Sequence, residues 1–116
     1  MSREKEIEKV QRKVLRWFKK NDRICSQILI TFLDTQNELG FVDYDFLAQR
    51  CSHIKTFKTN FAQMVNIARK NHGKVFERTE DNRVILWKPV EKDIRKAYQE
   101  YLETKSVILL IPNEKV

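Results

Sequence analysis

The sequence predicts a mainly helical α+β domain with one small β-hairpin, in a single unit of 116 residues. Three observations predict it. Apolar residues recur at steps of three and four over most of the chain. Branched and aromatic residues cluster on both sides of one turn between residues 74 and 88. Only two Gly and two Pro occur, and 41% of the residues are apolar, so regular elements should follow one another closely around one core.

The N-terminal segment, residues 3–20, is predicted to be an amphipathic helix. Its apolar face, with the spacing that a helix requires, consists of Ile7, Val10, Val14, Trp17 and Phe18, widened by Leu15. Acidic residues near its start and lysines near its end suit the helix dipole; the acidic ones are Glu4, Glu6 and Glu8. The opposite face is basic and carries Lys9, Arg12, Lys13, Arg16, Lys19 and Lys20.

A second helix and a short strand are predicted next. Residues 24–33 are apolar on nearly every side, which predicts a helix in the centre of the domain. A polar, turn-forming cluster at residues 34–37 ends this helix. Residues 39–42 are apolar but too few for a helix, so we expect one short strand there.

Two short helices follow, separated by a turn of about four residues. Asp43 is placed to cap a helix over residues 44–51. Thr56 is placed to cap a second helix over residues 57–71, and Gly73 to close it. Two short helices joined in this way form a helix-turn-helix pattern. The inward residues of the first of them are predicted to be Phe46, Leu47 and Ala48.

The last third of the chain contains the hairpin, a helix and an apolar tail. Residues 74–79 and 83–88 are predicted to be the two strands of the hairpin. Pro89 ends the second strand, and helical periodicity then resumes over residues 91–103. The tail at residues 106–111 is strongly apolar, and an exposed strand of that kind would pair with other strands. We therefore expect the tail to be covered, by its own chain or by a second subunit.

The order of elements from residue 22 to residue 88 resembles the winged helix-turn-helix superfamily. That order is helix, short strand, helix, turn, helix and two-stranded hairpin. The resemblance implies that the helix over residues 57–71 enters the major groove of DNA, and that the hairpin over residues 74–88 touches the flanking backbone or the minor groove. The helices over residues 3–20 and 91–103 are additions to this core.

The net charge of +7 is unevenly distributed along the chain. Residues 1–21 carry eight Lys or Arg against three Asp or Glu, and residues 55–88 carry the same numbers. Residues 22–54 are net acidic, and residues 89–116 are neutral. Two basic segments separated by an acidic one are typical of a phosphate-binding face. A basic solvated surface on an ordinary domain is the alternative interpretation.

The helix over residues 57–71 is predicted to have a polar face free for a partner. Its core stripe consists of Phe57, Phe61, Met64, Val65 and Ala68. No Asp or Glu occurs from residue 55 to residue 76. Amide side chains can read adenine, and Lys or Arg can reach guanine or phosphate. Surface helices also carry such residues simply because they solvate well.

The hairpin tip is the second candidate contact. Arg78 and Arg83 flank it, and an arginine there can enter a narrow minor groove or pair with phosphate. Ordinary cross-strand pairs between these arginines and the acidic Glu80 and Asp81 are the alternative. Together, the predicted nucleic-acid-binding residues are Lys55, Lys58, Thr59, Asn60, Gln63, Asn66, Arg69, Lys70, Lys74, Arg78, Asn82 and Arg83.

No pattern in the sequence predicts catalysis, a metal site or a cofactor. Cys51 and His53 are too close for the usual paired metal spacing, and a second ligand pair is missing. Cys25 and Cys51 are instead predicted to be buried core thiols in a reducing cytoplasm. Neither a signal-like start nor a run of apolar residues long enough for a membrane span is present in the sequence.

The sequence thus predicts a non-enzymatic, cytoplasmic DNA-binding protein, most simply a small transcriptional regulator associated with double-stranded DNA in the nucleoid. A winged-helix module for protein–protein interaction within a larger complex is one alternative, and an RNA-binding domain is another. A homodimer through the terminal helices and the tail would place two recognition helices on successive major grooves. A monomer with the tail folded onto the first helix is the other possibility.

Overall fold

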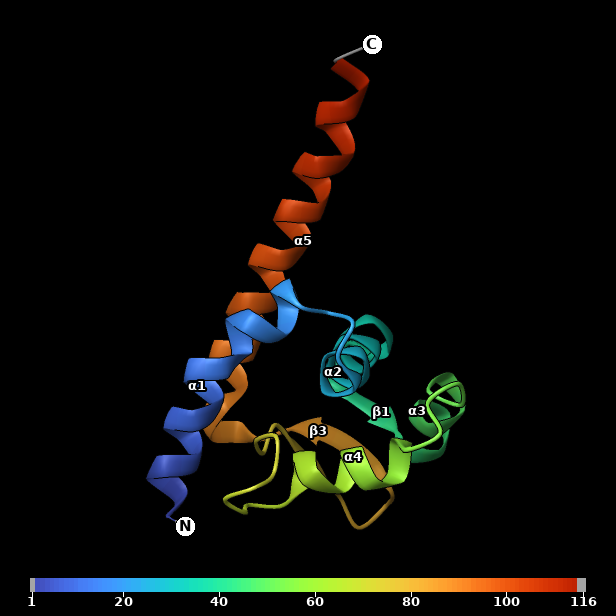
Figure 1. Ribbon diagram of the computed structural model, residues 1–116. Coiled ribbons are helices and arrows are strands. Elements are labelled where there is room, and N and C mark those ends of the chain that lie inside the picture. Colours follow the sequence, from blue (N-terminus) through green and yellow to red (C-terminus); the bar gives the residue numbers. More distant parts are fainter. Residues whose placement is uncertain (1, 115–116) are drawn as a thin grey trace.

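The computed structural model describes the backbone of residues 2–114 and the side chains of residues 2–105. Within this part of the chain, five α-helices accompany a small antiparallel sheet, so the predicted α+β class is confirmed (Figure 1). In chain order the elements are α1 (Arg3–Lys19), α2 (Ile24–Thr35), β1 (Phe41–Asp43), α3 (Tyr44–Arg50), α4 (Phe57–Val65), β2 (Phe76–Arg78), β3 (Arg83–Leu86), a 3-10 turn η1 (Lys88–Val90) and α5 (Glu91–Glu114). In this part of the chain no helix is both long and apolar enough to cross a membrane.

The sheet joins the predicted hairpin to the short strand that precedes α3. Its strand order is β1-β3-β2, with Val84 opposite Val42 on one side and opposite Arg78 on the other. The strand predicted at residues 39–42 begins later, at Phe41, and this is a correction. The side chain of Asn37 accepts hydrogen bonds from the backbone amides of Leu39 and Phe41, which folds residues 37–40 into a turn and leaves Leu39 exposed.

The second helix, α2, lies at the centre of the domain, as its apolar character predicted. Ile28, Leu29 and Phe32 are completely buried. The ring of Phe32 lies 5.1 Å from the ring of Phe76 in β2, and Phe76 stacks on Phe61 of α4 at 5.6 Å. This aromatic row fixes α4 against both α2 and the sheet.

The two short helices α3 and α4 are separated by the predicted turn, but their caps differ from the prediction. Asp43 and Thr56 occupy the N-cap positions, yet neither side chain makes a capping hydrogen bond. The Asp43 carboxylate lies 3.9 Å from Arg83, and Thr56 accepts a hydrogen bond from Asn60. Phe46, which we expected to be buried, is 46% exposed on the outer side of α3.

Helix α4 is shorter than predicted, since it ends at Val65 and not near Asn71. Asn66 has an extended backbone, and residues 66–75 form a loop that lies against α1 (Figure 1). In the sequence the apolar spacing of a helix continues past Val65. In the structure, however, carbonyl groups of residues beyond Val65 accept hydrogen bonds from lysines of α1 and not from a further helical turn. Gly73 allows the loop to approach closely, because a Cβ there would lie 3.1 Å from Val10 and 3.2 Å from Trp17.

A buried ion pair on α1 holds this loop. Glu6 is completely buried and Lys9 is 5% exposed. This corrects the prediction from the sequence, which placed Lys9 on the basic outer face of the helix and Glu6 among the acidic residues near its start that suit the helix dipole. The Lys9 ammonium lies 3.0 Å from Glu6 and donates to the backbone carbonyls of Ala68 and Asn71. The other carboxylate oxygen of Glu6 accepts a hydrogen bond of 2.7 Å from the backbone amide of Lys74. We call this group of contacts the Glu6–Lys9 latch.

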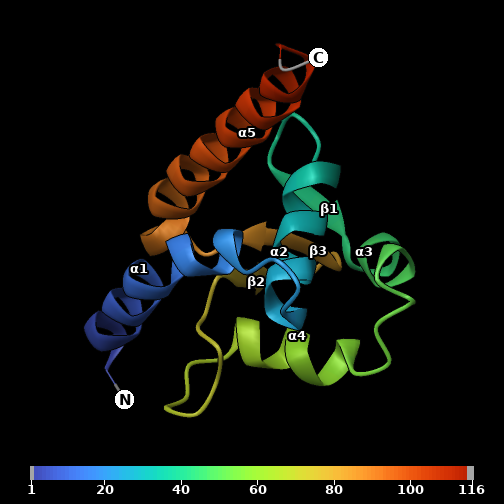
Figure 2. The ribbon, with the colours of Figure 1, turned by 45° about the horizontal axis from the view of Figure 1, so that its top comes forward.

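The last helix, α5, packs along α1 (Figure 2). Phe18 of α1 meets Tyr101 and Tyr98 of α5 at ring distances of 5.4 and 6.1 Å. The helix was predicted to end at residue 103, but its backbone continues to Glu114, through the segment that we expected to form a separate apolar tail. No Gly or Pro stands between residues 91 and 111, which permits a continuous helix over that segment, and Pro112 lies in the last turn of α5. The side chains of residues 106–111 lie outside the described ones.

We expect replacement of either member of the latch to destabilise the domain strongly. Glu6→Ala leaves a buried ammonium group without its counter-charge, and Lys9→Met leaves a buried carboxylate unpaired. Each should lower the free energy of unfolding by about 3–5 kcal/mol, measured by urea denaturation. The neighbouring Glu8→Ala, on the exposed side of α1, is the matched control and should change it by less than about 0.5 kcal/mol. Equal stability of Glu6→Ala and Glu8→Ala would contradict the buried pair.

Candidate nucleic-acid interface

Helix α4 presents a short polar face to solvent. Lys58, Thr59 and Ala62 are exposed, and Gln63 is half-buried. The opposite side is held in the core by Phe57, Phe61 and Met64, all buried as predicted. Lys55 is exposed in the turn that precedes the helix. The outer face of α4 is therefore rigidly positioned and carries no acidic group.

Asn60 was predicted to lie at the edge of this outer face, and its side chain contacts the loop that follows α4. Its amide nitrogen donates to the carbonyl and hydroxyl oxygens of Thr56, both at 2.9 Å. Its amide oxygen faces Nε2 of His72 at 2.7 Å, so Nε2 carries the proton and donates. The Asn60 side chain thus joins α4 to the loop.

The shortening of α4 changes the position of three predicted residues. Asn66 follows the helix directly, and its amide nitrogen donates back to the carbonyl of Ala62. Arg69 and Lys70 lie in the loop and are exposed. They stand between the two carbonyls that Lys9 binds, so they lie beside α1 and not on the outer face of α4.

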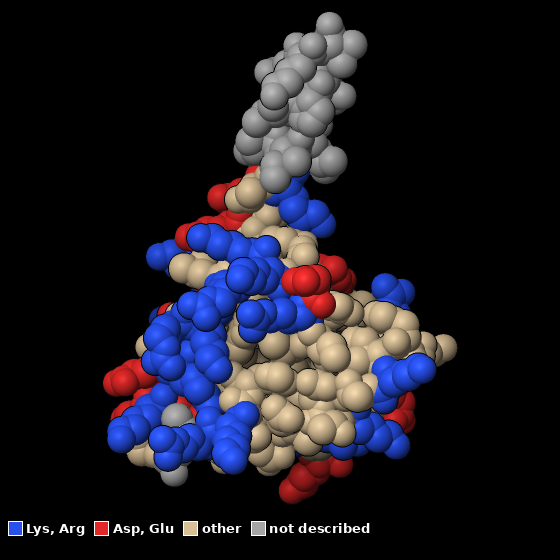
Figure 3. Space-filling model, in the orientation of Figure 1, with Lys and Arg blue, Asp and Glu red and all other residues tan. Residues whose placement is uncertain are grey.

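The loop brings the two basic segments of the sequence onto one surface. Lys13 of α1 donates to the carbonyl of His72, one turn beyond the latch. Figure 3 shows the result as a continuous band of Lys and Arg that runs over α1 and the loop, beside a largely uncharged face over α2 and α4. The two charge concentrations of the sequence therefore form one electrostatic feature.

The hairpin arginines are braced by aromatic rings. The Arg78 guanidinium lies 3.6 Å from the ring centre of Tyr44 and donates to the Asn82 side chain, and Asn82 occupies the tip with a φ of 64°. The Arg83 guanidinium lies 4.1 Å from the ring of Phe41 and 3.3 Å from Asp81. The pairing of Arg83 with Asp81 that the sequence left as an alternative is thus present, within the turn and not across the strands. Both arginines remain exposed.

Lys74, another predicted contact residue, is half-buried at the start of the hairpin. Its ammonium group lies 5.2 Å from the centre of the Trp87 ring and 3.3 Å from the Glu77 carboxylate. Its charge is therefore partly balanced within the protein.

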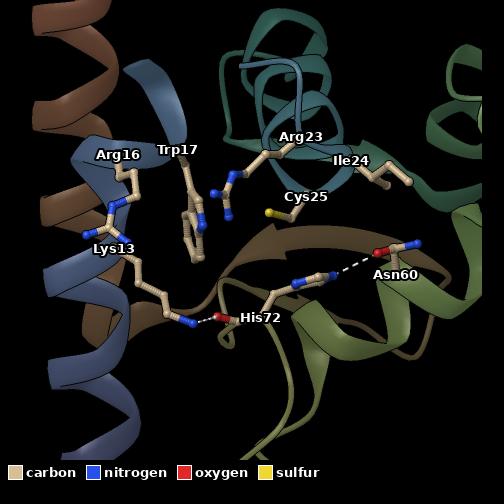
Figure 4. Close-up of a pocket in the computed structure, with 8 residues that line it drawn as sticks. All are labelled: Lys13, Arg16, Trp17, Arg23, Ile24, Cys25, Asn60 and His72. Atoms are coloured by element: carbon tan, nitrogen blue, oxygen red, sulfur yellow. Dashed lines mark hydrogen bonds between the residues drawn. The ribbon is translucent and has the colours of Figure 1, made fainter. Parts of the chain in front are cut away.

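A cavity of about 370 Å³ opens between α1, the start of α2, α4 and the loop. Its basic lining consists of Lys13, Arg16, Arg23 and His72, and the rest consists of Trp17, Ile24, Cys25 and Asn60 (Figure 4). Among the described residues, those that line the cavity include no Asp or Glu. None of the ion pairs between described side chains involves the three lining Lys and Arg residues.

The positive charges of Lys13, Arg16 and Arg23 are not balanced by any acidic residue among the described residues that line the cavity. Burial lowers the pKa of His72, and the nearby ammonium groups of Lys13 and Lys9 lower it further. Burial and the charges of Lys9 and Arg12 also lower the pKa of Lys13. Burial raises the pKa of the Cys25 thiol, so it adds no negative charge at neutral pH. A negative ligand in this cavity would relieve the repulsion.

Sequence reasoning did not assign Lys13, Arg16, Arg23 and His72 to a site. The basic face of the first helix was visible as a pattern, but nothing local linked it to a histidine about 60 residues later. Comparison of the chain with models of protein families, with curated proteins and with solved structures gives no match. The homodimer through the terminal helices and tail stays a prediction.

We expect the pKa of His72 to lie below its usual value near 6.5, because the ring is partly buried beside two ammonium groups. Lys13→Gln should raise this pKa, and Lys5→Gln, an exposed change of equal charge near the start of α1, should not. With this lowered pKa, the unfolded chain binds more protons at His72 than the folded chain does once the pH falls below about 6.5. The free energy of unfolding should therefore decrease as the pH falls through that range. Titration of the His72 ring signals by NMR measures the pKa directly. An unchanged value in Lys13→Gln would show that the ammonium does not act on the ring.

Proposed function

We propose that this protein is a winged-helix domain that binds double-stranded DNA through α4 and the adjoining basic surface. The observation that carries the proposal is the union of two basic segments, distant in sequence, beside the acid-free outer face of α4. A small transcriptional regulator is the simplest role for such a domain.

The arrangement of elements supports the winged-helix assignment. The order α2, β1, α3, α4, β2, β3 matches that of the superfamily, and β1 pairs with β3 to form a three-stranded sheet. In such domains the helix that corresponds to α4 is the one that enters the major groove. Here α4 is held by the aromatic row beneath it, so its outer side chains are fixed relative to the sheet.

The chemistry of the α4 face suits base edges and phosphates together. Gln63 can form a bidentate pair with adenine, and Thr59 can bond to several base edges. The exposed Ala62 lies next to Thr59 on this face, and its small side chain lets the helix approach a groove closely. Lys58 and Lys55 at the start of the helix are exposed and suit phosphates on one strand.

The basic band supplies the sequence-independent part of the proposed binding. Arg69 and Lys70 from the loop and the exposed Arg12 and Arg16 from α1 would meet phosphates on the side of α4 opposite to the hairpin. On the hairpin side, Arg78 and Arg83 are stacked on Tyr44 and Phe41. Their bracing favours contact with the DNA backbone over deep insertion into the minor groove.

The salt dependence of binding tests this proposal. Contact with four to six phosphates gives a log–log slope of affinity against salt of about −4 to −5 for duplex DNA. Lys58→Gln and Lys70→Gln should each reduce the magnitude of the slope by about one, measured by fluorescence anisotropy with a labelled duplex. Lys92→Gln on α5, an exposed change of equal charge, is the control and should leave it unchanged.

Several outcomes would contradict the proposal. A slope near zero, or no duplex binding at about 50 mM salt, would exclude DNA binding of this kind and favour a protein-interaction module. Tighter binding to a single strand or to double-stranded RNA than to duplex DNA would favour the RNA-binding alternative. If Lys92→Gln reduced the magnitude of the salt slope as much as Lys58→Gln and Lys70→Gln do, the phosphate contacts would not be confined to α4 and the loop.

A further inference from the structure

We propose that the cavity between α1, α2, α4 and the loop binds the phosphate of a nucleotide. This site lies beyond the proposed major-groove contact, since none of the outward residues of α4 lines it, and Arg16 alone belongs both to the cavity and to the proposed phosphate contacts of the basic band. One chemistry, a nucleotide phosphate, has two sources here: the backbone of a bound DNA strand or a free nucleotide.

The residues that line the cavity suit an oxyanion. Arg16 and Lys13 come from α1, Arg23 precedes the first turn of α2, and His72 comes from the loop, so three cationic side chains and one imidazole line the cavity from three parts of the chain (Figure 4). Arginine supplies several donors in a fixed plane, which suits phosphate oxygens. The lining holds no carboxylate that would compete for these donors among the described residues.

The start of α2 adds to this preference. Its N-cap residue is Arg23, whose side chain makes no capping hydrogen bond. The first amide groups of a helix of 12 residues therefore begin at the cavity wall, beside Cys25. Unpaired amides and the positive end of the helix dipole favour an anion there.

The size and the apolar wall indicate more than a bare phosphate ion. A volume of about 370 Å³ lies in the range of small-molecule sites. Trp17 and Ile24 form an apolar part of the lining, and Figure 4 shows the Trp17 ring beside the Arg23 guanidinium. A sugar or base attached to the phosphate would contact this wall, because aromatic faces suit nucleotide rings.

His72 is a built-in reporter of the site. Its Nε2 donates to Asn60, so Nδ1 is an acceptor in the neutral ring and becomes a donor when protonated. A bound phosphate would raise the pKa of His72 by opposing the charges of Lys13 and Lys9. His53, the other histidine, is exposed in the turn before α4 and does not line the cavity, so it serves as an internal control.

The test is an NMR titration of both histidine rings in the full chain at low salt. Adenosine monophosphate and inorganic phosphate should shift the His72 signals saturably and leave His53 unchanged, whereas adenosine should shift neither. Loss of charged hydrogen bonds in Arg16→Gln or Arg23→Gln should weaken the binding of adenosine monophosphate by roughly ten- to a hundredfold. The charge-matched control Lys92→Gln should weaken it less than about twofold.

A second arm of the experiment distinguishes the source of the phosphate. If adenosine monophosphate displaces a labelled duplex and the duplex also shifts His72, the site takes a backbone phosphate. If the duplex binds equally well with the nucleotide present, the site takes a free nucleotide. Both results support the site.

The site is overturned if neither phosphate, adenosine monophosphate nor the duplex shifts His72, or if Arg16→Gln and Arg23→Gln both bind adenosine monophosphate as the unmodified chain does. Salt-dependent duplex binding without any response of His72 would leave the proposed function standing and remove only this site. Nucleotide binding without duplex binding would support this site and contradict the proposed DNA-binding function.

Discussion

A carboxylate and an ammonium group, both withdrawn from water, hold the segment between α4 and β2 against the first helix. Glu6 and Lys9 pair with each other, and together they bind three backbone groups of the loop. Burial of such a pair is costly unless its remaining hydrogen-bonding capacity is satisfied. Here two carbonyls and one amide of a loop without regular structure bind Lys9 and one Glu6 oxygen, and the other Glu6 oxygen faces the Lys9 ammonium alone, so pair and loop depend on each other.

The latch also determines where the positive charge of the molecule lies. Without it, the basic residues of the loop and those of α1 would belong to separate parts of the surface. With it, Lys13 reaches the carbonyl of His72, and the imidazole closes the cavity against Asn60 of α4. Burial, together with repulsion among the positive groups, lowers the pKa values of His72 and Lys13 in the folded state. An anion with several oxygens would relieve that repulsion, which links the stabilising latch to the proposed binding of phosphate groups.

Much of the fold could be predicted from local patterns, and the differences have a common cause. Branched and aromatic residues on both sides of a turn predicted the hairpin, and the apolar character of α2 predicted its central place. The predicted end of α4 was wrong because Val65 and Ala68 continue the apolar spacing of a helix. In the structure Lys9, about 60 positions earlier in the chain, binds carbonyls of the loop that follows Val65.

The pairing of Glu6 with Lys9 was hidden in the same way, since a Glu and a Lys three positions apart are common on solvated helix faces. For the candidate interface, the exposed residues of α4 followed from helical periodicity. The cavity could not be predicted in this way, because residues from α1, α2, α4 and the loop form it together.

Hydrogen exchange at the backbone amide of Lys74 tests the latch most directly. This amide belongs to a loop, and its protection depends on the hydrogen bond of 2.7 Å to the buried Glu6 carboxylate. We predict strong protection in the unmodified protein, and loss of that protection in Glu6→Ala under conditions in which the sheet amides of β3 stay protected. Exchange of the Lys74 amide at the rate of an unfolded chain in the unmodified protein would contradict the latch, and with it the common basic surface of α1 and the loop.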